Sequence, residues 1–209
     1  MTSLLILGST GLVGGHLLRL ALDDDRVARV VAPVRRTLPV HPRLDAPVVD
    51  FEALPADAAW WRVDAVACAL GTTIRDAGSR EAFRRVDVDY VVEAARHARA
   101  AGARSFALNT AAGANRSSFG FYLRCKGEAE DGVDALGYPS YTIVRPSMIG
   151  GERAQRRAME HAVVRIARAC AAVIPARWRV VEAEAIARRL LDAAIEAAPG
   201  RHVVESEAI

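Results

Sequence analysis

Lysine is almost absent from this chain: 27 of its 28 basic residues are arginine, and Lys126 is the only lysine. The chain also has 25 acidic residues, so the formal net charge is only +3, and the two signs are interspersed along the sequence. A nucleic-acid-binding protein normally gathers its basic residues on one face or in one stripe. The charge pattern therefore argues against nucleic acid as a partner.

Cysteines and long apolar segments are also scarce. Cys68, Cys125 and Cys170 lie far apart without a CxxC motif, which suits reduced, buried thiols and gives no metal site. The longest apolar runs, at residues 4–7 and 169–174, are far shorter than the roughly 18 residues that span a bilayer. The N-terminus lacks the basic segment of a signal peptide. We therefore expect no metal, no membrane contact and a cytoplasmic location.

Length and periodicity predict an α/β fold. A chain of 209 residues, 52% hydrophobic and 25% charged, has the size and composition of one folded unit. Apolar strands alternate with helical segments, which is typical of a doubly wound parallel sheet with helices on both faces. The expected strands cover residues 3–7, 27–34, 46–49, 63–70, 105–109, 140–144 and 202–205. The expected helices cover residues 12–22, 79–101, about 117–136, 154–173 and 182–198.

A glycine-rich turn, GSTGLVG at residues 8–14, stands where the first expected strand becomes the first helix. Glycine permits a tight turn there, lets backbone amides approach a pyrophosphate, and lets the helix pack close to the sheet. The helix N-terminus also favours phosphate charge. The alternative is a turn that binds nothing. The residues expected to hold a dinucleotide are Gly8, Thr10, Gly11, Leu12, Val13 and Gly14.

The residues after the second strand indicate which dinucleotide binds. NAD-specific sites usually place an acidic residue at this point, where it contacts the ribose hydroxyls. This chain has Arg35 and Arg36 instead, and guanidinium groups suit the 2′-phosphate of NADP. Asp50, after the next short strand, is placed to reach the adenine amino group. The alternative for these residues is a solvated surface. We expect NADP(H), with NAD(H) as the alternative cofactor.

Tyr122 and Lys126 lie four residues apart on an expected helix, so their side chains share one face. A nearby ammonium stabilises the ionised form of a phenol and so makes a tyrosine a usable acid and base. Thr110 closes the preceding strand at the sheet edge where ligands bind, and its hydroxyl is expected to hold a carbonyl oxygen. These three residues form the expected catalytic group. The alternative is a half-buried aromatic near an ordinary strand-end hydroxyl.

The glycine turn and the Tyr-xxx-Lys pair resemble those of the short-chain dehydrogenase/reductase superfamily, in its atypical, epimerase-like branch. Further segments are similar to the oxidoreductase group that includes the Tat-interacting tumour suppressor and its small bacterial relatives. They are VDFE at residues 49–52, CALGTT at 68–73, RVDVDY at 85–90 and YLRCKGE at 122–128. The likeness extends over about residues 3–150.

This resemblance implies a Rossmann-type fold, with residues 1–209 forming one NAD(P)-binding domain. Residues 146–209 then supply a reduced, helical substrate-side lobe. The loop after the fourth strand is implied to lie along the cofactor, and the lysine to bind the nicotinamide ribose. Besides the glycine turn, the implied cofactor-binding residues are Arg35, Arg36, Asp50, Leu70, Gly71, Thr72 and Lys126.

The chain departs from the family pattern at two places. Thr110 is followed by Ala111 and not by a second serine, so Ser117 or Ser118 is an alternative source of the catalytic hydroxyl. Either serine is also expected to cap the helix that carries the tyrosine. Asp87 stands in the long helix where many superfamily members have asparagine, which argues against a proton relay through that position.

Positive charge is concentrated in residues 147–180, which hold seven arginines and two glutamates, a formal +5. By the resemblance this segment overhangs the nicotinamide, so Arg145, Arg153 and Arg156 are placed to steer an anionic small-molecule substrate. The alternative is a solvated helix face, because the arginines of residues 157–168 fall opposite an apolar stripe. The short C-terminal region disfavours a bulky nucleotide sugar.

These observations favour an NADP-dependent reductase or dehydrogenase that acts on a small carbonyl or alcohol by hydride transfer, with Tyr122 as acid or base. Two alternatives remain open. One is a regulatory protein that senses NADPH, contacts a protein partner and has no turnover; the intact Tyr122–Lys126 pair argues against it. The other is an epimerase or dehydratase with tightly held NAD, which Arg35 and Arg36 disfavour.

Overall fold

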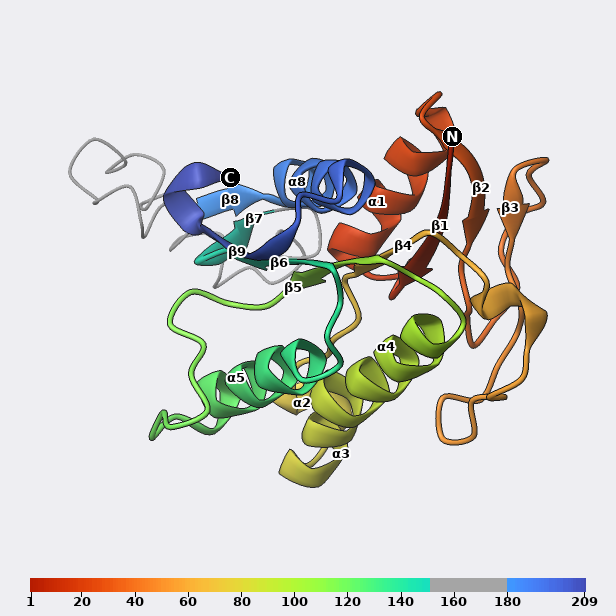
Figure 1. Cartoon of the computed structure of the whole chain (residues 1–209). Coiled ribbons are helices and arrows are strands. Elements are labelled where there is room, and N and C mark those ends of the chain that lie inside the picture. The colour runs from red at the N-terminus through yellow and green to blue at the C-terminus, as the bar shows by residue number, and fades with distance from the viewer. Residues whose placement is uncertain (151–179) are drawn as a thin grey trace.

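The computed structural model describes residues 1–150 and 180–209, and its centre is a seven-stranded sheet (Figure 1). The strand order is β3-β2-β1-β4-β5-β6-β9, and every neighbouring pair is parallel. Because the chain moves outward from β1 in both directions, the doubly wound α/β fold expected from the sequence is confirmed. The strands are β1 (Thr2–Leu7), β2 (Val27–Val31), β3 (Leu44–Asp45), β4 (Ala65–Cys68), β5 (Ser105–Asn109), β6 (Ser140–Arg145) and β9 (Gly200–Glu205).

Helices cover both faces of this sheet (Figure 1). Leu17 and Leu190 bring α1 and α8 into one core cluster, and Val91 and Val133 bring α4 and α5 into the cluster on the other face. Strands covered on both sides are apolar at nearly every position, which explains why residues 4–7 are fully buried. The helices are α1 (Leu12–Asp23), α2 (Ile74–Ala77), α3 (Arg80–Arg84), α4 (Tyr90–Ala100), α5 (Phe121–Asp134) and α8 (Ala183–Glu196), with short 3₁₀ turns at Ala59–Trp61 and Ser206–Ala208.

The long helix expected at residues 79–101 is confirmed, but it contains an irregular turn. Ser79 caps its start by accepting a hydrogen bond at 3.0 Å from the Ala82 amide, and Gly102 follows its end with a φ of +111°. Between α3 and α4 lies a π-turn, η2 (Arg85–Asp89). A π-turn holds one residue more than an α-helical turn, so the apolar spacing along the sequence does not reveal it.

The strand expected at residues 46–49 is wrong. β3 is the pair Leu44–Asp45, which lies beside Val30 and Val31 of β2. Beyond it only Val48 pairs, in an isolated bridge with Val34. Pro47 has no N–H to donate, and this prevents a regular ladder from continuing through that segment.

The start of α5 also differs from the expectation. The helix begins at Phe121, its N-cap is Gly120, and no side chain caps it. Ser118 instead accepts a hydrogen bond from the Gly120 amide at 3.2 Å, before the helix begins. The expectation that Ser117 or Ser118 caps the helix is therefore wrong, because Phe119 and the N-cap Gly120 still lie between Ser118 and the first helical residue.

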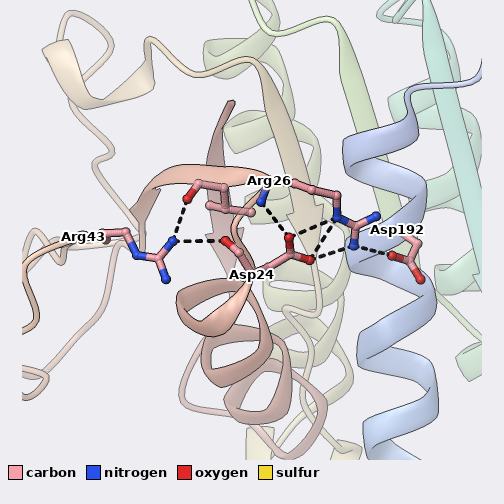
Figure 2. Close-up of polar contacts among 5 residues, drawn as sticks. Asp24, Arg26, Arg43 and Asp192 are labelled. Atoms are coloured by element: carbon pink, nitrogen blue, oxygen red, sulfur yellow. Dashed lines mark hydrogen bonds and ion pairs between the residues drawn. The ribbon is translucent and has the colours of Figure 1, made fainter.

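Two arginines, Arg26 and Arg43, form polar contacts near the amino end of β2 (Figure 2). Because the strands are parallel, this side of the sheet is opposite to the side where β1 ends. Arg26 binds Asp24 at the end of α1 and Asp192 of α8, each at 2.7 Å. Arg43 donates to the carbonyl oxygens of Asp24 at 3.0 Å and Val27 at 2.9 Å, and also to that of Leu22. These contacts satisfy carbonyl groups that the end of a helix leaves free.

A second, two-stranded parallel sheet is formed by β7 (Met148–Gly150) and β8 (Val180–Glu182). The helix expected at residues 154–173 lies outside the described residues, together with Arg153, Arg156 and Cys170. The last expected helix, at residues 182–198, is confirmed as α8, and the last expected strand, at residues 202–205, is confirmed as β9. Within the two described ranges, no helix is both long and apolar enough to cross a membrane.

Candidate functional site

The glycine turn depends on close backbone packing. Gly8 ends β1 with a φ of +83°, and a Cβ on it would lie 2.6 Å from the amide nitrogen of Leu70. A Cβ on Gly14 would lie only 1.9 Å from the carbonyl oxygen of Gly8. Gly11 donates to the same carbonyl at 2.9 Å. Only glycine at residues 8 and 14 allows α1 to approach the strand end this closely.

The N-terminus of α1 leaves polar groups available. Its N-cap is Gly11, and no side chain caps the first turn. The hydroxyl of Ser9 is buried and has no hydrogen-bond partner within the described part of the chain. Thr10 is exposed, whereas the side chain of Val13 is buried in the core. Free amides, an unpartnered hydroxyl and a glycine cradle together fit the phosphates of a dinucleotide.

The loop after β4 connects this turn to the other half of the site. Ala69 donates to the carbonyl oxygen of Leu7 at 2.9 Å, which extends the β1–β4 pairing up to the glycine turn. Gly71 is exposed, and a Cβ on it would lie 3.1 Å from Asp87 Oδ1 and 3.4 Å from Lys126 Nζ. The loop at residues 70–72 therefore lies between the glycine turn and the lysine.

Arg35 and Arg36 lie in the loop that follows the end of β2. The bridge between Val34 and Val48 holds the chain just before them, with the Val34 amide donating to the Pro47 carbonyl at 2.9 Å. Both arginines are exposed, and within residues 1–150 and 180–209 neither forms an ion pair. Asp50 is exposed as well, and its carboxylate accepts from the Glu52 amide at 2.9 Å. The two guanidinium groups are free to bind an anion.

Lys126 forms a buried ion pair. Its Nζ lies 2.6 Å from Oδ1 of Asp87, and the two residues are 7% and 2% exposed. The other oxygen of Asp87 accepts a hydrogen bond from the Thr72 amide at 2.8 Å. Burial acts to lower the pKa of Lys126, but the neighbouring groups, Asp87 first among them, together hold that pKa above its ordinary value. The lysine therefore stays an ammonium at neutral pH.

Tyr122 stands next to this pair. The Lys126 Nζ lies 5.7 Å from the centre of the Tyr122 ring, and the tyrosine is 40% exposed. On its other side the ring packs against buried Phe83, with centroids 5.8 Å apart. The structure thus places an accessible phenol beside a buried ammonium, near the loop that touches the glycine turn.

Thr110 does not join them. Its hydroxyl is buried and donates to Oε1 of Glu130 at 2.7 Å. Glu130 also binds Arg145, at 3.0 and 2.5 Å, and Arg145 reaches Glu205 at 3.1 Å. A hydroxyl has one proton to donate, and this one is committed to a carboxylate. The expectation that Thr110 holds a substrate carbonyl is therefore corrected: here it belongs to a buried network under α5.

The expectation that Arg145 steers an anionic substrate is also corrected, because this side chain belongs to the same network. Its guanidinium group is bound by two carboxylates, which raise its pKa, Glu130 most strongly. An arginine neutralised in this way does not steer an anionic substrate. Arg153 and Arg156, expected to act with it, lie outside the described residues.

Sequence reasoning missed the role of three polar residues. Asp87 was noted only as a replacement for asparagine; it contacts Lys126 from the π-turn, which hydrophobic spacing does not show. Ser9 lay inside the glycine motif without being singled out. Glu130 lies one helical turn after Lys126, so the spacing of residues 122, 126 and 130 was the available signal.

Two of the cysteines, Cys68 and Cys125, lie in the described residues. Cys68 and Cys125 are buried free thiols, and burial raises the pKa of Cys68 to about 12. Within the same residues, no three His, Cys, Asp or Glu side chains gather as a metal site would require.

The chain is similar to several known proteins. A family profile described as NAD(P)H-binding matches residues 8–162. Protein fmp52, mitochondrial, of Aspergillus clavatus is 33% identical over 222 residues, covering 100% of this chain and 94% of that protein. Protein HTATIP2 of Rattus norvegicus is 33% identical over 216 residues, covering 99% of this chain and 87% of that protein. The solved structure of MoeE5 in complex with UDP-glucose and NAD has a TM-score of 0.72 at 18% identity, covering 96% of this chain and 74% of that one; it is similar in fold.

Proposed function

We propose that this chain, which belongs to the NAD(P)H-binding family with HTATIP2 and fmp52 as relatives, is an NADP-dependent oxidoreductase acting on a small carbonyl or alcohol. We place it, as part of the same proposal, in the epimerase-like branch of the short-chain dehydrogenases/reductases. The observation that carries the proposal is the placement of Tyr122 beside buried Lys126 and the loop that packs on the glycine turn. A protein that only binds a dinucleotide has no need of an accessible phenol next to an ammonium.

The residues of the glycine turn and of the loop at 70–72 would hold the cofactor. NADP is favoured over NAD because Arg35 and Arg36 are exposed and have no ion-pair partner in the described ranges, so the 2′-phosphate meets two free guanidinium groups. Asp50 is proposed to contact the adenine. A bound nicotinamide supplies or accepts the hydride.

The chain's own residues then handle the proton. Tyr122 donates its phenolic proton to the substrate oxygen in the direction of reduction and takes it back in the direction of oxidation. Lys126 has two N–H donors left beyond the one bound to Asp87, and these are available for the nicotinamide ribose. Thr110 is assigned a supporting role: through Glu130 it fixes the inner face of α5, the helix that carries both residues.

The substrate side and the surroundings of the protein are also proposals. We propose one domain over residues 1–209. Of the substrate lobe expected at residues 146–209, α8 packs on α1 and β9 pairs with β6, so these two elements belong to the central fold. We also propose a small, anionic substrate attracted by the arginines of residues 147–180. Ser117 and Ser118 remain candidates for the hydroxyl that holds the carbonyl. A cytoplasmic location and the absence of membrane and nucleic-acid partners also stay predictions; the fungal relative is named mitochondrial.

The test is NADPH oxidation, followed by absorbance across a panel of small aldehydes and ketones, for the parent protein and Tyr122→Phe. Turnover in the parent and a loss of at least about 100-fold in the variant are expected, with NADPH affinity unchanged. Full activity of Tyr122→Phe would contradict the mechanism. Tight NADPH binding without turnover on any member of the panel would favour the sensor that binds a protein partner.

A further inference from the structure

The buried ammonium of Lys126 needs a permanent counter-charge. Its side chain is 9% exposed, and an unpaired charge in such a place costs several kcal/mol. Within the described residues the one carboxylate in contact with it is Asp87, at 2.6 Å. Asp87 is itself fully buried at its side chain, so solvent screens this pair weakly.

Asp87 joins three segments that the sequence keeps apart. It comes from the π-turn η2, binds Lys126 of α5 with Oδ1, and accepts the Thr72 amide of the loop after β4 with Oδ2. Both carboxylate oxygens are therefore used. If asparagine replaced Asp87, its amide would turn an N–H group toward either the Lys126 ammonium or the Thr72 amide, and both of these groups are donors.

We propose that Asp87 is a positioning residue of the acid–base site, which keeps Lys126 charged and directed at Gly71 and Tyr122. This inference rests on the proposed function, because it assigns a use to the ammonium in that reaction. The same carboxylate fixes the loop at residues 70–72, so the place of the charge and the place of the loop are set together. No proton needs to pass through Asp87 for this role.

Within residues 1–150 and 180–209, few charged and titratable groups act on Lys126. Asp87 faces it from η2, Tyr122 from its own helix and Cys68 from β4. Burial raises the pKa of Cys68 to about 12, so the thiol is neutral in the working range. Burial also acts to lower the pKa of Lys126, and of its neighbours Asp87 opposes this most strongly. Without the carboxylate, the strongest group that opposes desolvation is gone, and the lysine loses its proton at lower pH.

Lys126 is the only lysine of the chain, which allows a direct test. Protein labelled with ¹³C,¹⁵N-lysine and carrying a lysine-free tag gives one side-chain signal, whose shift reports protonation. In the parent protein we expect this signal to stay at its ammonium position up to about pH 10. In Asp87→Asn we expect its titration midpoint to fall by about two units or more. A midpoint unchanged in that variant would overturn the proposal.

Asp89→Asn is the matched control. Asp89 lies in the same π-turn and carries the same charge, but it is half-exposed and binds Arg84 at 2.7 Å. This variant should titrate like the parent. NADPH affinity gives a second readout: in Asp87→Asn it should weaken as pH rises through the new midpoint, and in Asp89→Asn it should not. A structural role alone would weaken binding equally at every pH.

Two further points keep the test decisive. If Asp87→Asn does not fold, the parent signal still decides, because a parent midpoint below about pH 9 would show that Asp87 does not hold the charge. Neither measurement of the lysine signal uses a substrate. A confirmed ion pair combined with no reduction of any carbonyl would therefore count against the proposed function and leave the assignment of Asp87 standing.

Discussion

The hydroxyl of Thr110 lies 2.7 Å from the carboxylate of Glu130 and donates its proton to it. The position of Thr110 directly after β5 predicts that this hydroxyl holds a carbonyl oxygen of the substrate. The contact instead makes Thr110 part of the support of α5, together with Arg145. The two roles predict different kinetics.

Replacing Thr110 by valine keeps the shape and removes the hydroxyl. We expect the free energy of unfolding to fall by about 1–2 kcal/mol, because a buried hydrogen bond is lost, and turnover to fall by less than about tenfold. Thr110→Ser, which restores the donor, should recover stability. Urea unfolding and steady-state rates measure both. A loss of 100-fold or more in Thr110→Val with unchanged stability would return the residue to the catalytic group.

Removal of the free guanidinium groups should reduce the preference for NADPH. In Arg35→Ala and Arg36→Ala we expect the ratio of NADH to NADPH dissociation constants to shrink by about tenfold, equivalent to ~1.4 kcal/mol. Binding is measured by titration with each cofactor. The control is Arg62→Ala, which removes an exposed arginine just before β4 begins, whereas Arg35 and Arg36 come after β2 has ended; it should leave the ratio unchanged. Equal affinity of the parent for both cofactors would remove the argument.

Neighbouring glycines of α1 should respond in opposite ways to alanine. At Gly14 the added Cβ would lie 1.9 Å from the Gly8 carbonyl oxygen, so the turn must move; we expect ~1–3 kcal/mol lower stability and loss of cofactor binding. At Gly15 the nearest atom is 3.8 Å away, and alanine should raise stability by ~0.5–1 kcal/mol. Thermal unfolding with and without NADPH tests the pair. Normal NADPH binding by Gly14→Ala would contradict the glycine-cradle assignment.

The Arg26 cluster predicts a dependence of stability on acid. Hydrogen bonds from Arg26 hold the pKa of Asp24 below its ordinary value. Its contribution is therefore complete above the ordinary carboxylate range, near pH 4, and is lost as pH falls through the lowered value. Arg26→Ala should lower stability at pH 7 by less than about 1 kcal/mol, because the pair is partly exposed, and should flatten the acid dependence. Urea unfolding at pH 7 and pH 3 tests this. An equally steep acid loss in the variant would contradict it.

The strand-and-helix plan could be read from the sequence because burial on both faces makes each strand an apolar run, and because Tyr122 and Lys126 share a face in any regular helix. The direction of the Thr110 hydroxyl could not be read. It depends on Glu130, 20 residues later in the chain, which comes close only when α5 packs on the sheet. Likewise, the place of β3 was decided by Pro47 and by hydrogen bonds to β2 that have no local signature.

Asp87 departs from the family pattern, in which many members have asparagine. The sequence shows this aspartate but does not show that it pairs with Lys126. Sequence spacing assumes about 3.6 residues per turn throughout a helix, whereas η2 closes wider turns over residues 85–89. The residues that follow are rotated relative to that assumption.

The π-turn rotates the side chains of α4 about the helix axis relative to those of α3. Before it, Phe83 faces α5 and the Tyr122 ring; after it, Val91 and Ala94 face the sheet. Deleting one residue within 85–89 would convert the segment to plain α-helix and turn one half against the other by about 100°. Either the sheet-facing side chains or the carboxylate would then be misdirected, so chain length at this point is constrained as tightly as residue identity.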